Sequence, residues 1–199
     1  MIDLYIIRLY DINMIMEWNV FRGWRVLEYF LLHPNTKIHP GQLSRNLKIS
    51  RFAAQTFCTS YLGDGILSKT EVGNINQFCI NEDDARVRAL KLFMGPYLVM
   101  DSTSLQPFLR DNRNVLSIAI YGSFAAGDYG DRSDLDLIII TADEKKPESR
   151  GLSAIELRLG REVSISVLSM ARWRAMEKKK DAFFLSVKKN HVIVWGNAI

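Results

Sequence analysis

Two strongly apolar segments flank a stretch of small and polar residues in the second half of the chain. The first, Leu116–Tyr121, is followed at once by Gly122 and Ser123. The second, Asp134–Ile140, opens with Asp-Leu-Asp and continues as an unbroken apolar run. Short apolar runs bounded by turn residues are typical of buried β-strands. The pattern therefore predicts two strands joined by a loop or short helix, with polar groups where the first strand ends and the second begins.

Asp134 and Asp136 are two positions apart in the second predicted strand. Because side chains alternate faces along a strand, both carboxylates point to the same face, about 6.6 Å apart along the chain. Two like charges at that distance repel by about 2.5 kcal/mol at an effective dielectric of about 20. A divalent cation would turn this repulsion into attraction, so the pair is a candidate metal and catalytic site.

The turn at Gly122 and Ser123 offers the groups that bind a phosphate. Glycine lets the backbone approach closely, and the start of a helix presents amide donors beside the serine hydroxyl. A phosphate-binding turn next to a metal-binding carboxylate pair predicts metal-assisted phosphoryl or nucleotidyl transfer.

These residues resemble the signature of the DNA polymerase beta-like nucleotidyltransferases, which is Gly-Ser, about ten residues, then Asp-x-Asp. Here ten residues separate Ser123 from Asp134. The resemblance is to the minimal branch of the family and covers roughly residues 114–199. It implies a nucleoside triphosphate substrate, with ATP expected. Gly122 and Ser123 would hold the β and γ phosphates, and two Mg²⁺ ions would sit on Asp134 and Asp136.

The family often carries a third carboxylate on the next core strand, and the corresponding residue here is Ser164. Residues 161–168 alternate as a half-buried strand does, and the Arg-x-Val-x pattern that begins at Arg161 assigns the position to Ser164. Without the third carboxylate one metal is weakly held and the attacking hydroxyl lacks its base, so catalysis is expected to be slow. Glu162, two residues earlier on the same strand face, is the alternative third ligand if the register differs.

The first half of the chain alternates apolar and polar residues with helical spacing and then changes to two short strands. The predicted helices span residues 20–33, 40–47 and 51–62, and the predicted strands span 66–70 and 76–80 around Gly73-Asn74. Three helices followed by a hairpin resemble a winged helix-turn-helix domain. Residues 82–100 are predicted to form a closing helix.

In such a domain the helix after Ser50 is the recognition helix. Ser50, Arg51 and Gln55 would face the major groove of duplex DNA, and Lys69 in the wing would contact a phosphate. Between residues 20 and 60 six Lys and Arg residues accompany one acidic residue, Glu28. Such a local excess favours nucleic acid. Winged helices also serve as protein-docking or dimer modules, so a protein-only role, including a homodimer, stays open.

The tail of the chain is also basic. A solvated helix face and an electrostatic patch for nucleic acid or an acidic partner both account for this charge. The residues concerned are Arg172, Arg174, Lys178, Lys179, Lys180, Lys188 and Lys189.

The whole sequence predicts an α+β protein of two domains. A winged helix-turn-helix domain occupies residues 16–113. A nucleotidyltransferase core occupies residues 114–199, with a small mixed sheet and helices on one face. Met14 and Met16 are alternative starts, so residues 1–15 are left out of the first domain. No apolar run reaches the roughly 18 residues that span a bilayer. Two cysteines without a Cys-x-x-Cys pair favour a cytoplasmic protein.

The implied function is transfer of a nucleoside monophosphate from a nucleoside triphosphate to a protein or small-molecule acceptor. The minimal branch resembles antitoxins that adenylylate a HEPN-type ribonuclease partner, and antibiotic-modifying relatives also exist. The alternative is a DNA-binding transcriptional regulator whose second domain binds nucleotide but is weakly active or inactive. The chain is too short for polymerase fingers and thumb, so templated DNA synthesis is not expected.

Overall fold

The structure, a computed structural model, describes residues 21–101, 105–148 and 152–199. The alternative starts at Met14 and Met16 lie outside the described residues. Contacts divide the chain into two compact units, Met1–Val87 and Arg88–Ile199. The polar segment near residue 113, where the sequence suggested a boundary, lies further along the chain. Each unit has buried apolar residues of its own.

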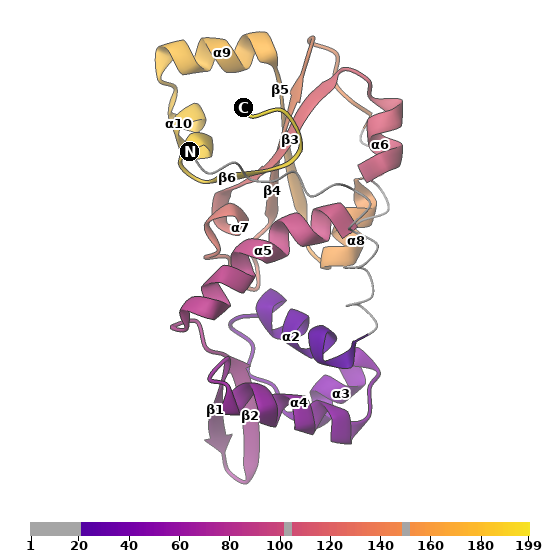
Figure 1. Cartoon of the computed structure of the whole chain (residues 1–199), viewed down its shortest axis with the longest axis vertical. Helices are drawn as coiled ribbons and strands as arrows, with labels where there is room; N and C mark the ends of the chain where they lie inside the picture. Colours follow the sequence, from indigo (N-terminus) through magenta and orange to yellow (C-terminus); the bar gives the residue numbers. More distant parts are fainter. Residues whose placement is uncertain (1–20, 102–104, 149–151) are drawn as a thin grey trace. The chain divides into compact units, whose positions relative to one another are not determined.

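The first unit contains three helices followed by an antiparallel hairpin (Figure 1). Gly73, at φ +60°, permits the tight turn between the two strands. An isolated bridge between Ile38 and Phe78 adds a short segment beside the hairpin. The elements are α2 (Arg22–Leu32), α3 (Pro40–Leu47), α4 (Arg51–Gly63), β1 (Leu67–Val72) and β2 (Ile75–Ile80). The three predicted helices and two predicted strands are therefore all present.

Local sequence explains where these helices begin. His39 caps α3 by accepting a hydrogen bond at Nδ1 from the amide of Gly41 (3.0 Å), and Pro40 occupies the first turn. The hydroxyl oxygen of Ser50 accepts a hydrogen bond from the amide of Ala53 (3.1 Å) and so caps α4. The apolar faces of the helices and the hairpin form the core, which includes Trp24, Phe30, Leu31, Leu43, Cys58, Leu67 and Phe78.

The second unit is organised around a four-stranded sheet with the order β5-β4-β3-β6. β4 and β5 are parallel, whereas β3 is antiparallel to both of its neighbours. The strands are β3 (Val115–Tyr121), β4 (Leu135–Thr141), β5 (Val163–Ser169) and β6 (His191–Gly196). The predicted α+β fold with a small mixed sheet and flanking helices is confirmed.

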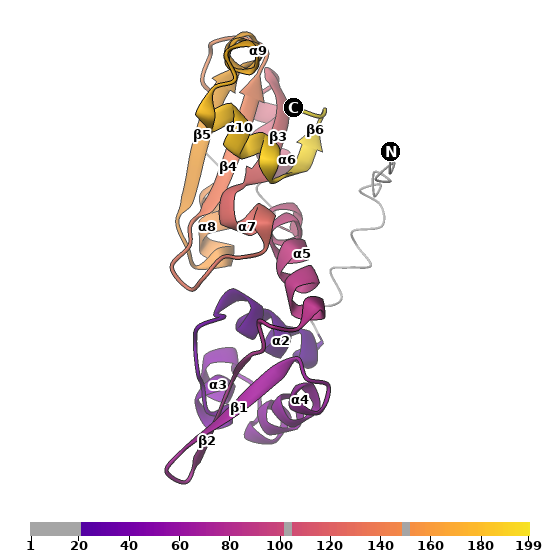
Figure 2. The same ribbon diagram turned by 90° about the vertical axis from the view of Figure 1, so that its left-hand side faces the viewer.

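Helices cover both faces of this sheet, so the expectation of helices on one face is wrong. Ile138 and Ile140 pack with Trp173, Phe184 and other residues of α9 and α10; these two helices lie in front of the sheet in Figure 2. On the opposite face, Ile120 of β3 lies against Gly95 of α5. β4 is apolar at consecutive positions because both of its faces are buried.

The helices of the second unit differ widely in length. They are α5 (Ala85–Asp101), most of which lies in this unit, α6 (Leu105–Asp111), α7 (Gly122–Ala126), α8 (Ser153–Leu159), α9 (Met170–Lys179) and α10 (Ala182–Lys189). In the described parts of the chain, no helix is both long enough and apolar enough to cross a membrane.

Candidate active site

The turn from β3 into α7 passes through Gly122, at φ +68°. This is the left-handed region of backbone conformation, which residues other than glycine rarely adopt. The space beside the glycine is occupied by Asp136, because a Cβ atom added at Gly122 would collide with its Oδ2 atom. Glycine is therefore required both for the backbone conformation and for the close approach of this carboxylate. The structure brings two of the predicted site residues into contact.

Strand pairing explains the contact. Tyr121, the last residue of β3, is the cross-strand partner of Asp136 in β4. Ser123 follows in the first turn of α7, and its carbonyl oxygen accepts a hydrogen bond from the amide of Asp128 (3.1 Å). The Ser123 hydroxyl and the carboxylates therefore lie at the same end of the sheet.

The two carboxylates have different surroundings. Asp134 is exposed just before β4, and Asp136 is half-buried within it. Burial raises the pKa of Asp136, and the negative charge of Asp134 raises it further. A divalent cation beside the pair would oppose both effects. Carboxylate oxygens are the hard ligands that Mg²⁺ prefers, so the donor set fits this ion.

Ser164, the residue expected at the third carboxylate position, lies beside Asp136 in the sheet. In the parallel pairing of β4 with β5, Asp136 is directly opposite Ser164, whose side chain is exposed. Glu162 precedes β5, and its carbonyl oxygen accepts a hydrogen bond from the amide of Leu135 (3.0 Å). The register of β4 and β5 thus sets Ser164, and not Glu162, opposite Asp136. Among residues 21–101, 105–148 and 152–199, no group of three or more His, Cys, Asp or Glu side chains could hold a metal ion.

The loop between α7 and Asp134 is held by Arg161, a residue that the motif did not identify. Its guanidinium donates hydrogen bonds to the carbonyl oxygens of Gly130 (2.5 Å) and Ser133 (3.0 Å). The hydroxyl of Ser133 in turn accepts a hydrogen bond from the amide of Gly130 (2.9 Å). Burial lowers the pKa of Arg161, and nearby acidic groups oppose that shift. Arg161 therefore fixes the backbone immediately before the carboxylates.

Aromatic stacking supports the same loop. Tyr129 is fully buried and stacks on Phe124 of α7, with ring centroids 3.9 Å apart. The Arg161 guanidinium carbon lies 5.5 Å from the Phe124 ring centre, and Lys91 Nζ lies 4.7 Å from that of Tyr129. Such cation–π contacts are stronger when buried. The only sequence signal for this cluster was the pair of aromatic residues on either side of Gly127.

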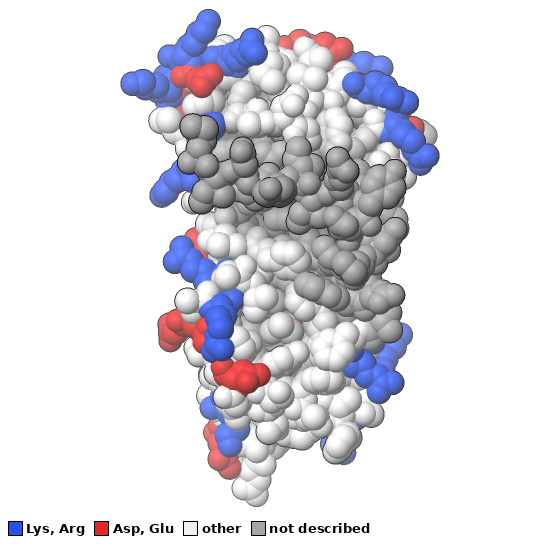
Figure 3. Space-filling view, viewed as in Figure 1, with Lys and Arg blue, Asp and Glu red and all other residues white. Residues whose placement is uncertain are grey.

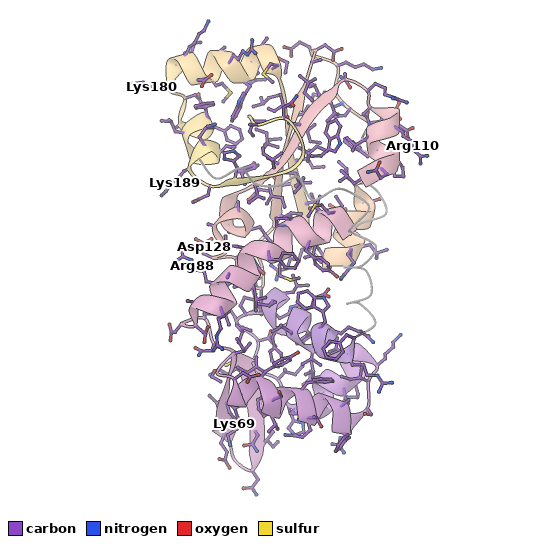
Figure 4. The ribbon with its side chains drawn as sticks, viewed as in Figure 1. Lys69, Arg88, Arg110, Asp128, Lys180 and Lys189 are labelled. Carbon is purple, nitrogen blue, oxygen red and sulfur yellow. The ribbon has the colours of Figure 1, made fainter. Side chains whose placement is uncertain are left out.

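The basic residues of the tail are all exposed along α9 and α10 and at Lys180 between them. Figure 3 shows Lys and Arg side chains gathered over this part of the second unit. Figure 4 labels Lys180 after α9, and Lys189 at the end of α10, where β6 is about to begin. The acidic residues of the same segment are Glu177 and Asp181.

The predicted DNA-contacting residues lie in the first unit. Ser50, Arg51 and Gln55 are exposed at the start of α4, and Gln55 donates a hydrogen bond to the hydroxyl of Thr59 (3.1 Å). Lys69 is exposed on β1 (Figure 4). The structure thus places two of the four on α4, Ser50 at its N-terminal cap and Lys69 on the hairpin.

Comparison with known proteins finds a similarity in the second half of the chain. Residues 103–183 match the family model described as polymerase beta, nucleotidyltransferase. No curated protein matches the chain at a significant level. A crystal structure from Sulfolobus solfataricus, provisionally described as a nucleotidyltransferase, is 19% identical, with a TM-score of 0.36. The match covers 59% of this chain and 94% of that one. A toxin–antitoxin structure with AMP-PNP is 20% identical, with a TM-score of 0.35, over 49% and 74% of the two chains.

The matched segment contains Gly122, both aspartates and Ser164, and it ends before β6. The close approach of Gly122 to Asp136 and the family match agree. Residues 103–183 are therefore similar to the nucleotidyltransferase domain of polymerase beta.

Proposed function

We propose that the second unit is a Mg²⁺-dependent nucleotidyltransferase that transfers a nucleoside monophosphate from a nucleoside triphosphate to a hydroxyl group of an acceptor. The observation that carries this proposal is the contact between Gly122 and Asp136. This contact supports the proposal because the turn expected to bind phosphate lies beside Asp136, and Asp134 is two residues earlier, on the same expected strand face. ATP is the expected nucleotide, and a protein or small molecule is the expected acceptor.

In the proposed reaction the acceptor oxygen attacks the α phosphorus. A new phosphorus–oxygen bond forms, the bond to the β phosphate breaks, and pyrophosphate leaves. Gly122 and Ser123 hold the β and γ phosphates through backbone amides and the serine hydroxyl. Asp134 and Asp136 would hold Mg²⁺, which when bound neutralises charge on the reacting phosphate. Arg161 keeps the loop before the carboxylates in place.

Ser164 sets the expected rate. A serine beside Asp136 cannot accept the acceptor proton as a carboxylate would, and it contributes no negative charge to a second metal. We therefore propose slow transfer. A HEPN-type ribonuclease partner is one candidate acceptor, supported by the resemblance of the motif to the minimal branch of the family.

Calorimetry with Mg²⁺ and α,β-methylene ATP, whose α–β bridge resists cleavage, tests the nucleotide site. Replacing Asp134 and Asp136 together by Asn should abolish Mg²⁺-dependent binding and leave the fold intact. Asp128→Asn is the matched control, since Asp128 is exposed in the neighbouring loop (Figure 4). Unchanged affinity in the double variant would refute the assignment. Incubation with labelled nucleotides and a cell lysate, with and without Mg²⁺, then seeks the acceptor.

We also propose that the first unit is a winged helix-turn-helix domain that binds duplex DNA. The supporting observation is the exposed start of α4, where Arg51, Gln55 and the 82% exposed Phe52 lie on a helix without acidic residues. Arginine can read a guanine edge, and an aromatic side chain can contact a thymine methyl group. The alternative function, a regulator whose second unit binds nucleotide with little activity, rests on the same surface.

Fluorescence anisotropy with labelled duplex DNA and the full chain tests this second proposal. Affinity should fall with salt with a log–log slope of roughly −0.9 per phosphate contact. Arg51→Ala should weaken binding to a preferred sequence by about 1–3 kcal/mol, whereas Lys69→Ala should weaken all sequences alike. Lys146→Gln, which removes an exposed charge from the second unit, serves as the control. Absence of binding at low salt would favour the protein-docking role.

A further inference from the structure

At the end of the sheet that carries the candidate site, four directly paired residues, one from each strand, form a row. Ser164 pairs with Asp136, Asp136 pairs with Tyr121, and Tyr121 pairs with His191, the first residue of β6. Directly paired residues of neighbouring strands point to the same face of a sheet. His191 therefore lies on the face that carries Asp136, two strands away, or about 10 Å at the usual strand spacing.

The environment of His191 is cationic and partly enclosed. The residue follows Lys188 and Lys189 of α10, and both lysines are exposed. Burial lowers the pKa of His191, the charge of Lys188 lowers it further, and the carbonyl groups of Val187 and Lys188 oppose the shift. The imidazole is therefore mainly neutral at pH 7 and is able to take up a proton when an anion approaches.

The order of the strands fixes the direction in which a triphosphate would lie. The Gly122–Ser123 turn leaves the end of β3, between the carboxylates of β4 on one side and His191 of β6 on the other. The α phosphate must be next to Asp134 and Asp136, where the chemistry takes place. The β phosphate then lies over the turn, and the γ phosphate is directed toward β6.

We propose that His191 binds the γ phosphate of the nucleotide and, after transfer, the pyrophosphate that leaves. This inference rests on the proposed binding of a nucleoside triphosphate at the Gly122–Ser123 turn. β6 lies outside the segment that matches the family model, so the family match does not assign this residue.

The charge balance of the site supports this role. A bound triphosphate brings several negative charges to a site that already has two carboxylates. Ser164 is on β5, on the side of Asp136 away from β6, so the missing third carboxylate affects the reacting end of the nucleotide and supplies no cation to the terminal phosphates. His191 on the β6 side, next to Lys188 and Lys189 in the sequence, offers the terminal phosphates a hydrogen-bond donor beside two positive charges.

Nuclear magnetic resonance can observe this contact directly, because the chain contains only three histidines. The ring signals of His33 and His39, both in the first unit, serve as internal references. Adding Mg²⁺ and α,β-methylene ATP should shift the ring signals of His191 alone. α,β-Methylene ADP, which lacks the γ phosphate, should shift them much less. Equal shifts with the two nucleotides would overturn the assignment.

Two variants separate a phosphate contact from a structural role at the end of α10. Asn places its amide where Nδ1 of the ring stands, and Gln places it near Nε2, so each retains one polar position without a charge. Both His191→Asn and His191→Gln should weaken binding of the triphosphate analogue about tenfold, which is the equivalent of one charge-assisted hydrogen bond. Affinity for the diphosphate analogue should change less than about twofold on the same scale. Lys179→Gln on α9 controls for lost positive charge.

The outcomes are distinguishable from those that test the proposed function. If wild-type protein binds the triphosphate analogue and the His191 variants bind it equally well, His191 serves only the end of α10 and the inference fails alone. If thermal stability falls in both variants while the preference for triphosphate over diphosphate is retained, the inference also fails. If wild-type protein binds neither analogue, the proposed function itself fails.

Discussion

Asp136 and Ser164 are directly opposite each other on neighbouring parallel strands. Ser164→Asp should therefore place a third carboxylate on the carboxylate face. Without metal, the added like charge should lower stability by up to about 1 kcal/mol, or a melting temperature by about 2–4 °C. Mg²⁺ should more than restore it and increase transfer to a suitable acceptor. Melting curves with EDTA or Mg²⁺ measure this, with Ser164→Asn as the uncharged control. A fast wild-type enzyme that Glu162→Gln inactivates would instead identify Glu162 as the ligand.

The glycine at the turn can be tested against a glycine with the same backbone conformation. Gly122 and Gly160 have φ values of +68° and +63°, but a Cβ atom at Gly160 would meet nothing within 4 Å. Gly160→Ala should lower the free energy of unfolding by about 1–2 kcal/mol, because alanine disfavours the left-handed conformation. Gly122→Ala should cost more and should also abolish binding of the triphosphate analogue, because Asp136 must move. Equal losses of stability, with binding retained, would contradict the contact.

The raised pKa of Asp136 predicts how stability depends on pH in metal-free protein. The folded protein binds this proton more readily than the unfolded chain. Stability from this group is therefore greatest below the unfolded pKa, about 3.9, and falls as pH rises through the raised folded pKa. Asp136→Asn should melt higher than wild type at pH 7, and the difference should vanish near pH 4. Thermal denaturation in EDTA from pH 4 to pH 8 measures this, with Asp128→Asn as the exposed control.

Arg161 should matter for stability although it is far from the motif in sequence. Arg161→Ala leaves the carbonyl groups of Gly130 and Ser133 without a charged donor and removes a cation from the aromatic pair. The expected loss is about 2–4 kcal/mol, together with weaker binding of the triphosphate analogue. Arg132→Ala, an exposed residue of the same loop, should stay within about 0.5 kcal/mol. Urea denaturation compares the two, and similar losses would show that Arg161 does not hold the loop.

The sequence was most informative where function and local structure use the same residues. Gly122, Asp136 and Ser164 could be placed because strand alternation and turn chemistry act over a few residues. The structure sets Ser164 opposite Asp136, and Ser164 is the residue that the Arg-x-Val-x pattern indicated. Likewise, Ser50 caps the start of α4, and Gly73 permits the turn of the hairpin, both as local sequence rules predict.

Long-range relationships could not be read from the same patterns. The hydrogen bonds of Arg161 reach about thirty residues back along the chain, and His191 meets Tyr121 only because β6 pairs with β3. Helix α6 was missed because residues 105–111 are short and contain a proline. The continuous apolar run of β4 indicated that both faces of the strand are buried. The run does not show which helices cover those faces.

The pairing of β6 with β3 also determines when the sheet can be completed during synthesis. The hydrogen bond from the Ser117 hydroxyl to the Asn197 carbonyl spans 80 residues. β3 and β4 can form a hairpin soon after they leave the ribosome, but the other edge of β3 stays open until β6 emerges. At usual elongation rates that takes about 4–16 s. Throughout that interval the nascent chain exposes an isoleucine-rich strand edge, the kind of surface that aggregates. The most vulnerable period of this protein is therefore its synthesis, when chaperones matter most.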